Sequence, residues 1–589
     1  MRLRSCRLCC KAFAGALVLD SVVGAGRGAD LAADEGGRGR QKVLSGGAKM
    51  GVGNGGVNPL DGAFGAFARE RLERWHVPGI AVAVVDGEET WAEGYGISSF
   101  PSTPVTPSTL FYAGSTTKAS TAAIVSQLID SGSYTFDSGP LSWQTPLSQL
   151  LPEDFVLSAG YEWAAAHLSV EDALSHRTGF PRHDKALARR YGVDAHPGAV
   201  RDVVRSLRYL PMVAEPRVRW RYCNVMYMVV SHAVQSLTGR WLGELMREGI
   251  WAPLGMGDTF LSVEEAVDKG REVAGGYYWD YKGDGGFVEV PKLGLALASG
   301  AGGVVSNVRD YARWVRCLIK GDKGDEGVGC KVLSKEAHRE LKRARMVKGL
   351  ESKKGFDAPT AYALGWEAGT YKGHRVFTHS GGMEAYGALV YFFPDLEYGI
   401  ITLGNTAITS NVVGNELIWK LIDDKLGIPE EERYDWAGLG NKTVQQALKQ
   451  FETAVEELYP QRAIPPLPHT FPLQEYVGVY SHPAYQNITL ELVEGADETA
   501  RSSPAKTEDK KAELKANRGD MEWQMTFEFI HVSGEFWAVV IDMLNSPNSL
   551  NGQLARAEFV VGVNGKVDRL KMEFLEDGSE GVIVFDKIA

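Results

Sequence analysis

Short apolar runs predict two groups of β-strands that lie far apart in the chain. Residues 80–85 and 91–95 form the first group, and the Asp86-Gly87 pair between them is typical of a hairpin turn. The second group comprises residues 375–378, 387–393 and 398–403. Apolar residues at helical spacing predict helices over 64–75, 226–237, 310–319 and 415–426. We therefore expect an α+β domain, an α/β sandwich in which distant strands share one antiparallel sheet beside an inserted helical lobe.

Strand-like alternation resumes after a helical stretch at 442–458 and a proline-rich stretch at 464–472. Six segments beyond this point alternate between apolar and polar residues: 476–480, 489–493, 526–530, 536–541, 557–563 and 569–574. The charged run 498–520 between them predicts a loop. Together these segments favour a small antiparallel β-barrel or sandwich.

The same patterns divide the chain into four parts. A glycine-rich leader (1–58) precedes the α+β domain (59–430), a helical and proline-rich connector (431–465) and the β domain (466–589). The basic first residues and the apolar stretch after them, interrupted by Asp20, have the outline of a signal peptide or an organelle presequence. The sequence leaves the cellular compartment open. The protein is secreted or organellar if this segment directs transport, and cytoplasmic if it does not.

Composition excludes several classes of function. The net charge of −11 over 589 residues argues against a nucleic-acid surface, and no apolar run approaches membrane-spanning length. Three of the six cysteines lie in the first ten residues: Cys6, Cys9 and Cys10. The other three are scattered along the chain: Cys223, Cys317 and Cys330. The sequence therefore indicates neither a disulfide framework nor a four-cysteine metal site.

The segment 111–128 holds the first candidate for chemistry. Gly114 interrupts an extended run, and the residues from Thr116 onward predict a buried helix. Ser115 then lies at the helix N-terminus, and Lys118 lies on the same face three residues later. A hydroxyl beside an ammonium is the beginning of an activated nucleophile. The structural alternative is an ordinary serine cap followed by a helical lysine.

Two further segments supply candidate partners. Tyr222 and Asn224 are two residues apart, so in an extended loop both side chains point to one side; a phenol can serve as a general base and an amide can hold a carbonyl. The alternative is a buried tyrosine and a capping asparagine.

The third segment follows a predicted strand end: His379-Ser-Gly-Gly382. Glycines there let backbone N–H groups approach a ligand closely, as an oxyanion hole requires. The alternative is a polar residue at a strand terminus.

In this order the three segments resemble the three motifs of serine β-lactamases and penicillin-recognising peptidases. Ser115-Thr-Thr-Lys118 is similar to the first motif, Tyr222-Cys-Asn224 to the second and His379-Ser-Gly381 to the third. The tyrosine is typical of the class C branch and of its esterase, D-aminopeptidase (family S12) and acyltransferase relatives. Further stretches that are similar to this family are 76–84, 173–181, 251–259 and 299–310. The resemblance covers about residues 60–428, and the region after 466 is loosely similar to appended lipocalin-like domains.

The resemblance implies a fold, a reaction and a set of roles. The fold is the β-lactamase/transpeptidase-like sheet flanked by helices. Ser115 attacks an ester, amide or lactam carbonyl of a small molecule or peptide, and Lys118 and Tyr222 remove its proton. The backbone N–H groups of Ser115 and Gly382 form the oxyanion hole. Substrate is oriented by the remaining motif residues, Asn224, His379, Ser380 and Gly381. No metal or organic cofactor is required, and the oligomeric state stays open.

His379 departs from the pattern, because classical β-lactamases and peptidases have a lysine there that meets the substrate carboxylate. We expect β-lactams to be poor substrates and an esterase-like serine hydrolase to be the function, with water as the acyl acceptor. One alternative is an acyltransferase of secondary metabolism; another is a catalytically silent binding scaffold. A transferase must exclude water, and the aromatic segment 275–281 or the β domain is placed to cover the site.

Overall fold

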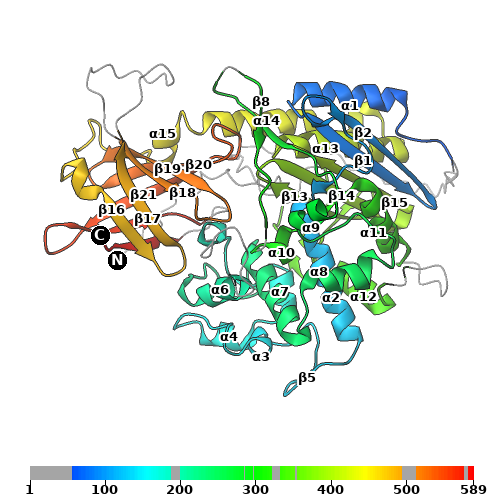
Figure 1. Ribbon diagram of the computed structural model, residues 1–589, viewed down its shortest axis with the longest axis horizontal. Coiled ribbons are helices and arrows are strands. Elements are labelled where there is room, and N and C mark those ends of the chain that lie inside the picture. The colour runs from blue at the N-terminus through cyan, green and yellow to red at the C-terminus, as the bar shows by residue number, and fades with distance from the viewer. Residues whose placement is uncertain are drawn as a thin grey trace, which may run out of the picture.

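The computed structural model describes residues 56–187, 199–283, 285–295, 297–321, 330, 332–351, 355–493, 513–575 and 581–589. The predicted leader lies outside this part of the chain except for its last three residues, and so do Cys6, Cys9 and Cys10. The described residues form an α+β domain and a β-barrel, which lie side by side (Figure 1). None of the described helices is both long and apolar enough to cross a membrane.

A nine-stranded antiparallel sheet forms the centre of the α+β domain, in the order β10-β11-β12-β13-β14-β15-β1-β2-β3. Three strands come from the start of the domain: β1 (Gly79–Asp86), β2 (Glu89–Ser99) and β3 (Thr103–Pro104). Six come from its end: β10 (Met346–Val347), β11 (Ala361–Tyr362), β12 (Glu367–Tyr371), β13 (His374–Met383), β14 (Tyr386–Phe393) and β15 (Tyr398–Gly404). The first and second predicted strand groups meet where β1 pairs with β15, with Ile80 opposite Gly404. The expected sharing of one sheet by distant segments is confirmed.

Helices cover both faces of this sheet, which explains why β1 is apolar at nearly every position. Ile80, Val82 and Val84 share a core with α1 (Gly62–Arg74) and α13 (Thr409–Leu426). Ala81, Ala83 and Val85 face the larger core, where α11 (Val308–Lys320) packs.

The helical lobe lies below the sheet in Figure 1 and surrounds α2 (Thr117–Asp130). Its members include α5 (Val170–Leu174), α6 (Ala199–Ser206), α7 (Asn224–Thr238) and α10 (Ser299–Gly302). Every residue from Thr117 to Ser126 is buried, because α7, α10 and α12 (Lys335–Lys342) all pack against α2. The small side chains of this helix permit that close packing.

Eight antiparallel strands close into the C-terminal barrel: β16 (Gly478–His482), β17 (Gln486–Val493), β18 (Glu513–Arg518), β19 (Met525–Ser533), β20 (Phe536–Met543), β21 (Gln553–Val561), β22 (Val567–Met572) and β23 (Ile583–Lys587). The predicted β domain is thus a barrel. One expectation is wrong: β18 lies inside the charged run that predicts a loop. Its alternation is weak in the sequence, with only Leu514 and Ala516 as apolar inward residues, and pairing with β17 and β19 decides its structure.

Two helices connect the α+β domain to the barrel. In α14 (Trp436–Lys449), Trp436 stacks on Trp419 of α13 with ring centroids 4.9 Å apart. In α15 (Ala454–Leu458), Leu458 packs with Val532 and Ala538 of the barrel. The connector is therefore attached to both bodies.

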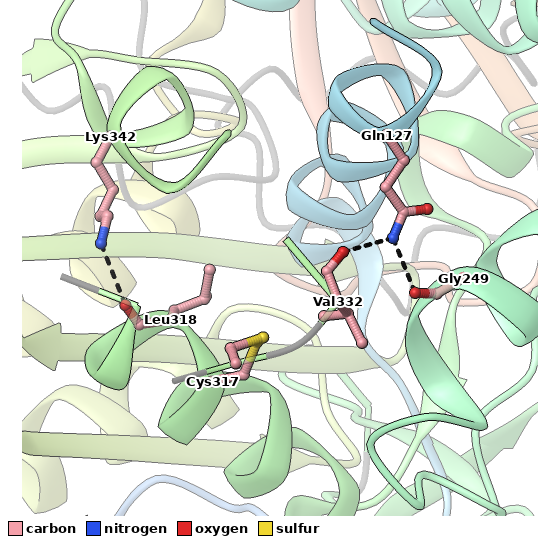
Figure 2. Close-up of a disulfide and its surroundings, with 7 residues drawn as sticks. Gln127, Gly249, Cys317, Leu318, Val332 and Lys342 are labelled. Carbon is pink, nitrogen blue, oxygen red and sulfur yellow. Dashed lines mark hydrogen bonds between the residues drawn. A yellow bond between two sulfur atoms is a disulfide. The ribbon is translucent and has the colours of Figure 1, made fainter. Parts of the chain in front are cut away.

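A disulfide joins Cys317 of α11 to Cys330 (Figure 2), a pairing that the sequence did not indicate. Close to it, Gln127 of α2 donates to the carbonyl oxygens of Gly249 (2.8 Å) and Val332 (2.7 Å). These contacts fix the far end of α2. His338 and the two sulfurs are the one group among the described residues with the spacing of metal ligands, but disulfide sulfurs are not thiolates, the form that binds metals.

Candidate active site

Ser115 lies in a 3₁₀ turn, η1 (Gly114–Thr116), between the short strand β4 (Phe111–Tyr112) and α2. The α-helix begins at Thr117, one residue later than expected. Gly114 has φ 50°, and a Cβ on it would lie 2.8 Å from the backbone nitrogen of Gly382. Glycine therefore permits both the turn and the close approach of Ser115 to β13.

Lys118 is fully buried beneath Ser115 and has three polar neighbours. Its Nζ lies 3.0 Å from Ser115 Oγ, 2.8 Å from Asn224 Oδ1 and 2.7 Å from the carbonyl oxygen of Ala301. Burial lowers the pKa of Lys118 well below its ordinary value, and the positive charge of Arg182 lowers it further. The nearby Asp184 opposes this shift only in part.

Tyr222 and Asn224 approach Ser115 from the start of α7. The Tyr222 hydroxyl lies 2.8 Å from Ser115 Oγ. Cys223 between them is extended, with φ −143° and ψ 107°, so both side chains reach the same site, as the two-residue spacing predicts. Asn224 Nδ2 donates to Asp184 Oδ2 at 2.9 Å, which orients its Oδ1 toward Lys118.

The third motif lies within β13, which continues to Met383 rather than ending near residue 378. Both ring nitrogens of His379 have partners: Nδ1 donates to the Ser380 carbonyl oxygen (2.7 Å), and Nε2 is 2.7 Å from the Tyr362 hydroxyl. The Gly381 carbonyl oxygen accepts from Asn411 Nδ2 at 2.9 Å. Gly382 lines the pocket with Ser115, whereas His379 does not border it.

Arg182 and Asp184 also border the pocket, and the sequence analysis did not single them out. Arg182 Nε lies 3.2 Å from Asp184 Oδ2, and its guanidinium lies over the Tyr222 ring, 4.7 Å from the centroid. Both residues directly follow the family-like stretch 173–181. This position next to a family-like stretch was the one feature of the sequence that could have marked them as site residues.

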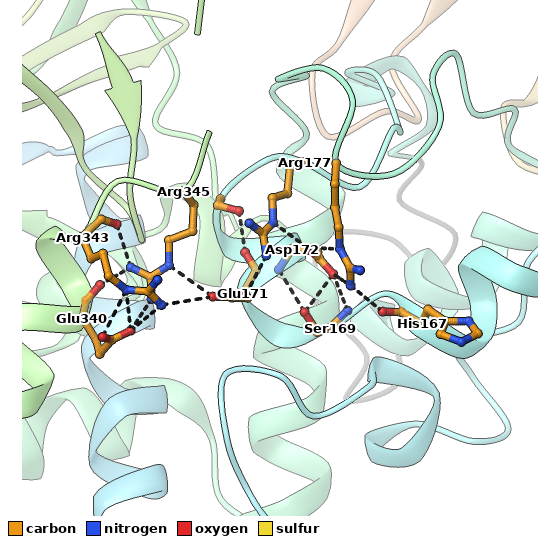
Figure 3. Close-up of polar contacts among 10 residues, drawn as sticks. His167, Ser169, Glu171, Asp172, Arg177, Glu340, Arg343 and Arg345 are labelled. Atoms are coloured by element: carbon orange, nitrogen blue, oxygen red, sulfur yellow. Dashed lines mark hydrogen bonds and ion pairs between the residues drawn. The ribbon is translucent and has the colours of Figure 1, made fainter. Parts of the chain in front are cut away.

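An ionic network around the buried Asp172 holds the loop that carries these two residues (Figure 3). Asp172 of α5 accepts from Arg177 (2.6 Å) and Arg217 (2.7 Å). Burial alone would raise the pKa of Asp172, but the hydrogen bonds from Arg217 and Ser169 and the charge of Arg177 lower it overall. Because Arg217 precedes Tyr222 by five residues, the network ties the loop to the second motif.

His176 links the same loop to Tyr222. Its Nδ1 accepts from the backbone N–H of Cys223 at 3.1 Å, and its ring lies 4.2 Å from that of Tyr222. Burial lowers the pKa of His176 well below 6.5, and the charge of Lys118 adds to this effect. His176 is therefore neutral and acts as a packing surface for Tyr222.

The pocket above Ser115 has a cavity volume of about 50 Å³ and is partly open to solvent. One side comes from the α+β domain and includes Arg182, Asp184 and Asn224. The other side comes from the barrel: Trp523, Met525, Ile541, Met543, Asn551 and Gln553. Of the two segments placed to cover the site, the β domain lines this pocket; none of its described lining residues comes from 275–281.

Two family models match the chain. The β-lactamase model matches residues 64–422, and a domain of unknown function, DUF3471, matches residues 462–585. Unguisins hydrolase ungD' of Aspergillus campestris is 38% identical over 512 residues, which is 86% of this chain and 88% of that protein. Unguisins hydrolase ungD of Aspergillus violaceofuscus is also 38% identical, over 84% of this chain and 86% of that protein.

Solved structures share the fold at low identity. The octameric penicillin-binding protein homologue from Pyrococcus abyssi has a TM-score of 0.53 and 18% identity, over 89% of this chain and 99% of that one. D-amino acid amidase from Ochrobactrum anthropi has a TM-score of 0.50 and 21% identity, over 62% of this chain and 99% of that one.

Proposed function

Because this chain belongs to the β-lactamase family and is a serine hydrolase, we propose that Ser115 forms an acyl-enzyme that water then hydrolyses. The observation that carries this proposal is the convergence of two groups that can transfer protons on one hydroxyl. Lys118 Nζ lies 3.0 Å and the Tyr222 hydroxyl 2.8 Å from Ser115 Oγ.

Lys118 has the surroundings of a neutral amine. A neutral amine has two N–H donors and one lone pair. Two of its neighbours, Asn224 Oδ1 and the Ala301 carbonyl oxygen, only accept hydrogen bonds. The lone pair is then directed at the third neighbour, the Ser115 hydroxyl, and burial favours this uncharged form. Lys118 can accordingly accept the serine proton during attack.

Tyr222 occupies the second position beside Ser115 Oγ. From there the phenol can pass a proton to the leaving group and then activate the water that attacks the acyl-enzyme. The guanidinium of Arg182, 4.7 Å from the ring centroid, stabilises negative charge on the phenol oxygen. Lys118 Nζ, 4.8 Å from the same centroid, adds to this effect once it has accepted the serine proton.

Backbone N–H groups of Ser115 and Gly382 are assigned to the developing oxyanion, because both residues border the pocket and η1 touches β13 there. We assign Asn224 to substrate orientation, together with Ser380 and Gly381 at the edge of β13. His379 stays a predicted substrate-orienting residue, acting through its neighbours, since Tyr362 and the Ser380 carbonyl oxygen occupy its ring nitrogens.

The substrate class follows from the relatives. Proteins that are 38% identical over most of their length are named unguisins hydrolases. We therefore propose that this chain hydrolyses an ester or amide bond of a related secondary metabolite, as a small-molecule or peptide acyl substrate.

Covalent labelling tests this function directly. A fluorophosphonate should add to the full chain once, and peptide mapping should place the adduct on Ser115. Product analysis with an activated ester and an alcohol acceptor then separates hydrolysis from transfer. If the transfer product dominates at millimolar alcohol, an acyltransferase replaces the hydrolase assignment.

A further inference from the structure

The barrel presents one end of its interior to Ser115. Inward-facing residues alternate along each strand, and Phe527 and Phe529 on β19 fill the barrel's interior. Met525 begins the same inward row and lies opposite Met543 of β20. Both methionines border the Ser115 pocket. The open end of the barrel therefore faces the nucleophile.

Six residues make up this barrel mouth: Trp523, Met525, Ile541, Met543, Asn551 and Gln553. Four of them are apolar. On the opposite side, the charged and polar side chains of Arg182, Asp184 and Asn224 lie beside apolar ones such as Leu295 and Met383. Aromatic side chains fill the barrel below, so the mouth is shallow. Methionine side chains adapt their shape to a bound group.

Hydrogen bonds on two sides hold the mouth over the site. Next to β13, Ser546 donates to Glu384 Oε1 (3.0 Å), and Asn551 Nδ2 donates to the Glu384 carbonyl oxygen (3.1 Å). On the loop that carries Arg182 and Asp184, His183 Nδ1 is 2.8 Å from the Tyr485 hydroxyl. The backbone N–H of Glu522 donates to the Leu187 carbonyl oxygen at 2.8 Å. The barrel is thus docked on both edges of the pocket.

We propose that the barrel mouth is a specificity subsite that binds a bulky apolar group of the substrate next to the scissile bond. This inference rests on the proposed acyl-enzyme at Ser115 and adds the chemical class that the enzyme selects. A large aliphatic or aromatic group of a peptide or acyl chain lies against the methionines at the open side of the pocket, and their flexible side chains adapt to it. A short acyl group reaches Ser115 without touching the mouth.

Labelling rates with two alkyl fluorophosphonates, ethyl and octyl, test the subsite in the full chain. Ser115 Oγ forms a bond to phosphorus as fluoride leaves, and the serine proton passes to its neighbouring base. Two buried methylenes are worth roughly a tenfold gain, so the octyl probe should label the wild type about tenfold faster or more. Intact mass against time gives both rates.

Trp523→Ala and Met543→Ser should each reduce the octyl rate about tenfold and leave the ethyl rate within twofold. The ethyl rate also reports that the variant is folded. Phe536→Ala is the matched control, since Phe536 is 48% exposed on the barrel surface and does not border the pocket; it should change neither rate.

Equal octyl and ethyl rates in the wild type overturn the subsite. So does an octyl preference that survives in both variants, or one that Phe536→Ala abolishes equally. A failed enzyme assignment gives a different result: neither probe labels the wild type, or Ser115→Ala is still labelled.

Discussion

The catalytic floor and the barrel mouth are built on opposite principles. On the catalytic floor (Ser115, Lys118, Tyr222 and Asn224) each side chain is held by hydrogen bonds to its neighbours. On the barrel mouth four of the six residues are apolar and contact through van der Waals packing. Hydrogen bonds fix direction, and apolar contacts tolerate changes of shape.

This difference separates chemistry from selection. A change on the floor should slow every substrate alike, because all substrates use the same nucleophile and base. A change at the mouth should alter the ranking of substrates and spare the smallest. The Glu384 contacts join the two, since Ser546 and the mouth residue Asn551 bind Glu384 just after the third motif.

Removing the proposed nucleophile should give the largest effect. Ser115→Ala should lower ester hydrolysis by about 10⁴-fold or more, the usual scale for loss of a covalent nucleophile, for long and short acyl groups alike. Initial rates with both ester classes measure this. Ser120→Ala on the same helix is the control. A trapped adduct on Ser120, Ser175 or Ser380 would contradict the assignment of Ser115.

The contacts of Glu384 with the barrel should stabilise the protein less as pH rises. Burial raises the pKa of Glu384 from 4.5 to about 7, and the charge of Asp542 adds to this, while hydrogen bonds from Ser546 and Asn545 oppose it. Because the folded state holds the proton more tightly, this stabilisation is complete below pH 4.5. This contribution is lost as pH rises from 4.5 to about 7, and above pH 7 the stability no longer changes with the ionisation of Glu384. The loss in free energy of unfolding over this range is about 3 kcal/mol.

Chemical unfolding of wild type and Glu384→Gln across pH 4–8 checks this. The glutamine variant cannot ionise, so wild-type stability should fall relative to it between pH 4.5 and 7. A difference between the two proteins that does not change with pH would rule out Glu384 as the titrating group.

Loss of the phenol should slow the chemistry and keep the selectivity. Tyr222→Phe should lower kcat by about 10²-fold or more, the usual contribution of a general base. The ratio of long-chain to short-chain kcat/KM should stay unchanged, because the mouth is intact. Tyr398→Phe is the control, because it removes the hydroxyl of a buried tyrosine that packs in the core shared with α1 and α13. A fully active Tyr222→Phe enzyme would assign the whole base function to Lys118.

A β-lactam should be a poor substrate, by about tenfold or more in kcat/KM against the best simple ester. His379 replaces the family lysine, and its ring nitrogens are hydrogen-bonded to Tyr362 and to the Ser380 carbonyl oxygen. A histidine is also a weaker anchor for a carboxylate near pH 7 than an ammonium. Turnover of nitrocefin at the rate of the best ester would show that another group, such as Arg182, meets the carboxylate.

Local regularities explain which parts of the fold could be predicted from sequence. The hairpin at Asp86-Gly87, the strands around it and the helices α1, α7 and α11 all follow from apolar spacing to within two or three residues, whereas α13 begins six residues before its predicted start at 415. The strands β18 and β23 were not predicted. Both are short and carry charged residues, so their structure depends on closing the barrel rather than on their own pattern.

The sequence by itself determined the pairing of Ser115 with Lys118, because residues three apart lie on one face both in a helix and in the 3₁₀ turn that leads into it. It also determined that Tyr222 and Asn224 point the same way. The tertiary structure alone decided how these pairs meet, since their partners lie more than a hundred residues apart. It alone placed Arg182 and Asp184 at the site, joined Cys317 to Cys330 and turned the barrel mouth toward Ser115. Such contacts depend on how separate elements pack, and no local pattern in the chain encodes that.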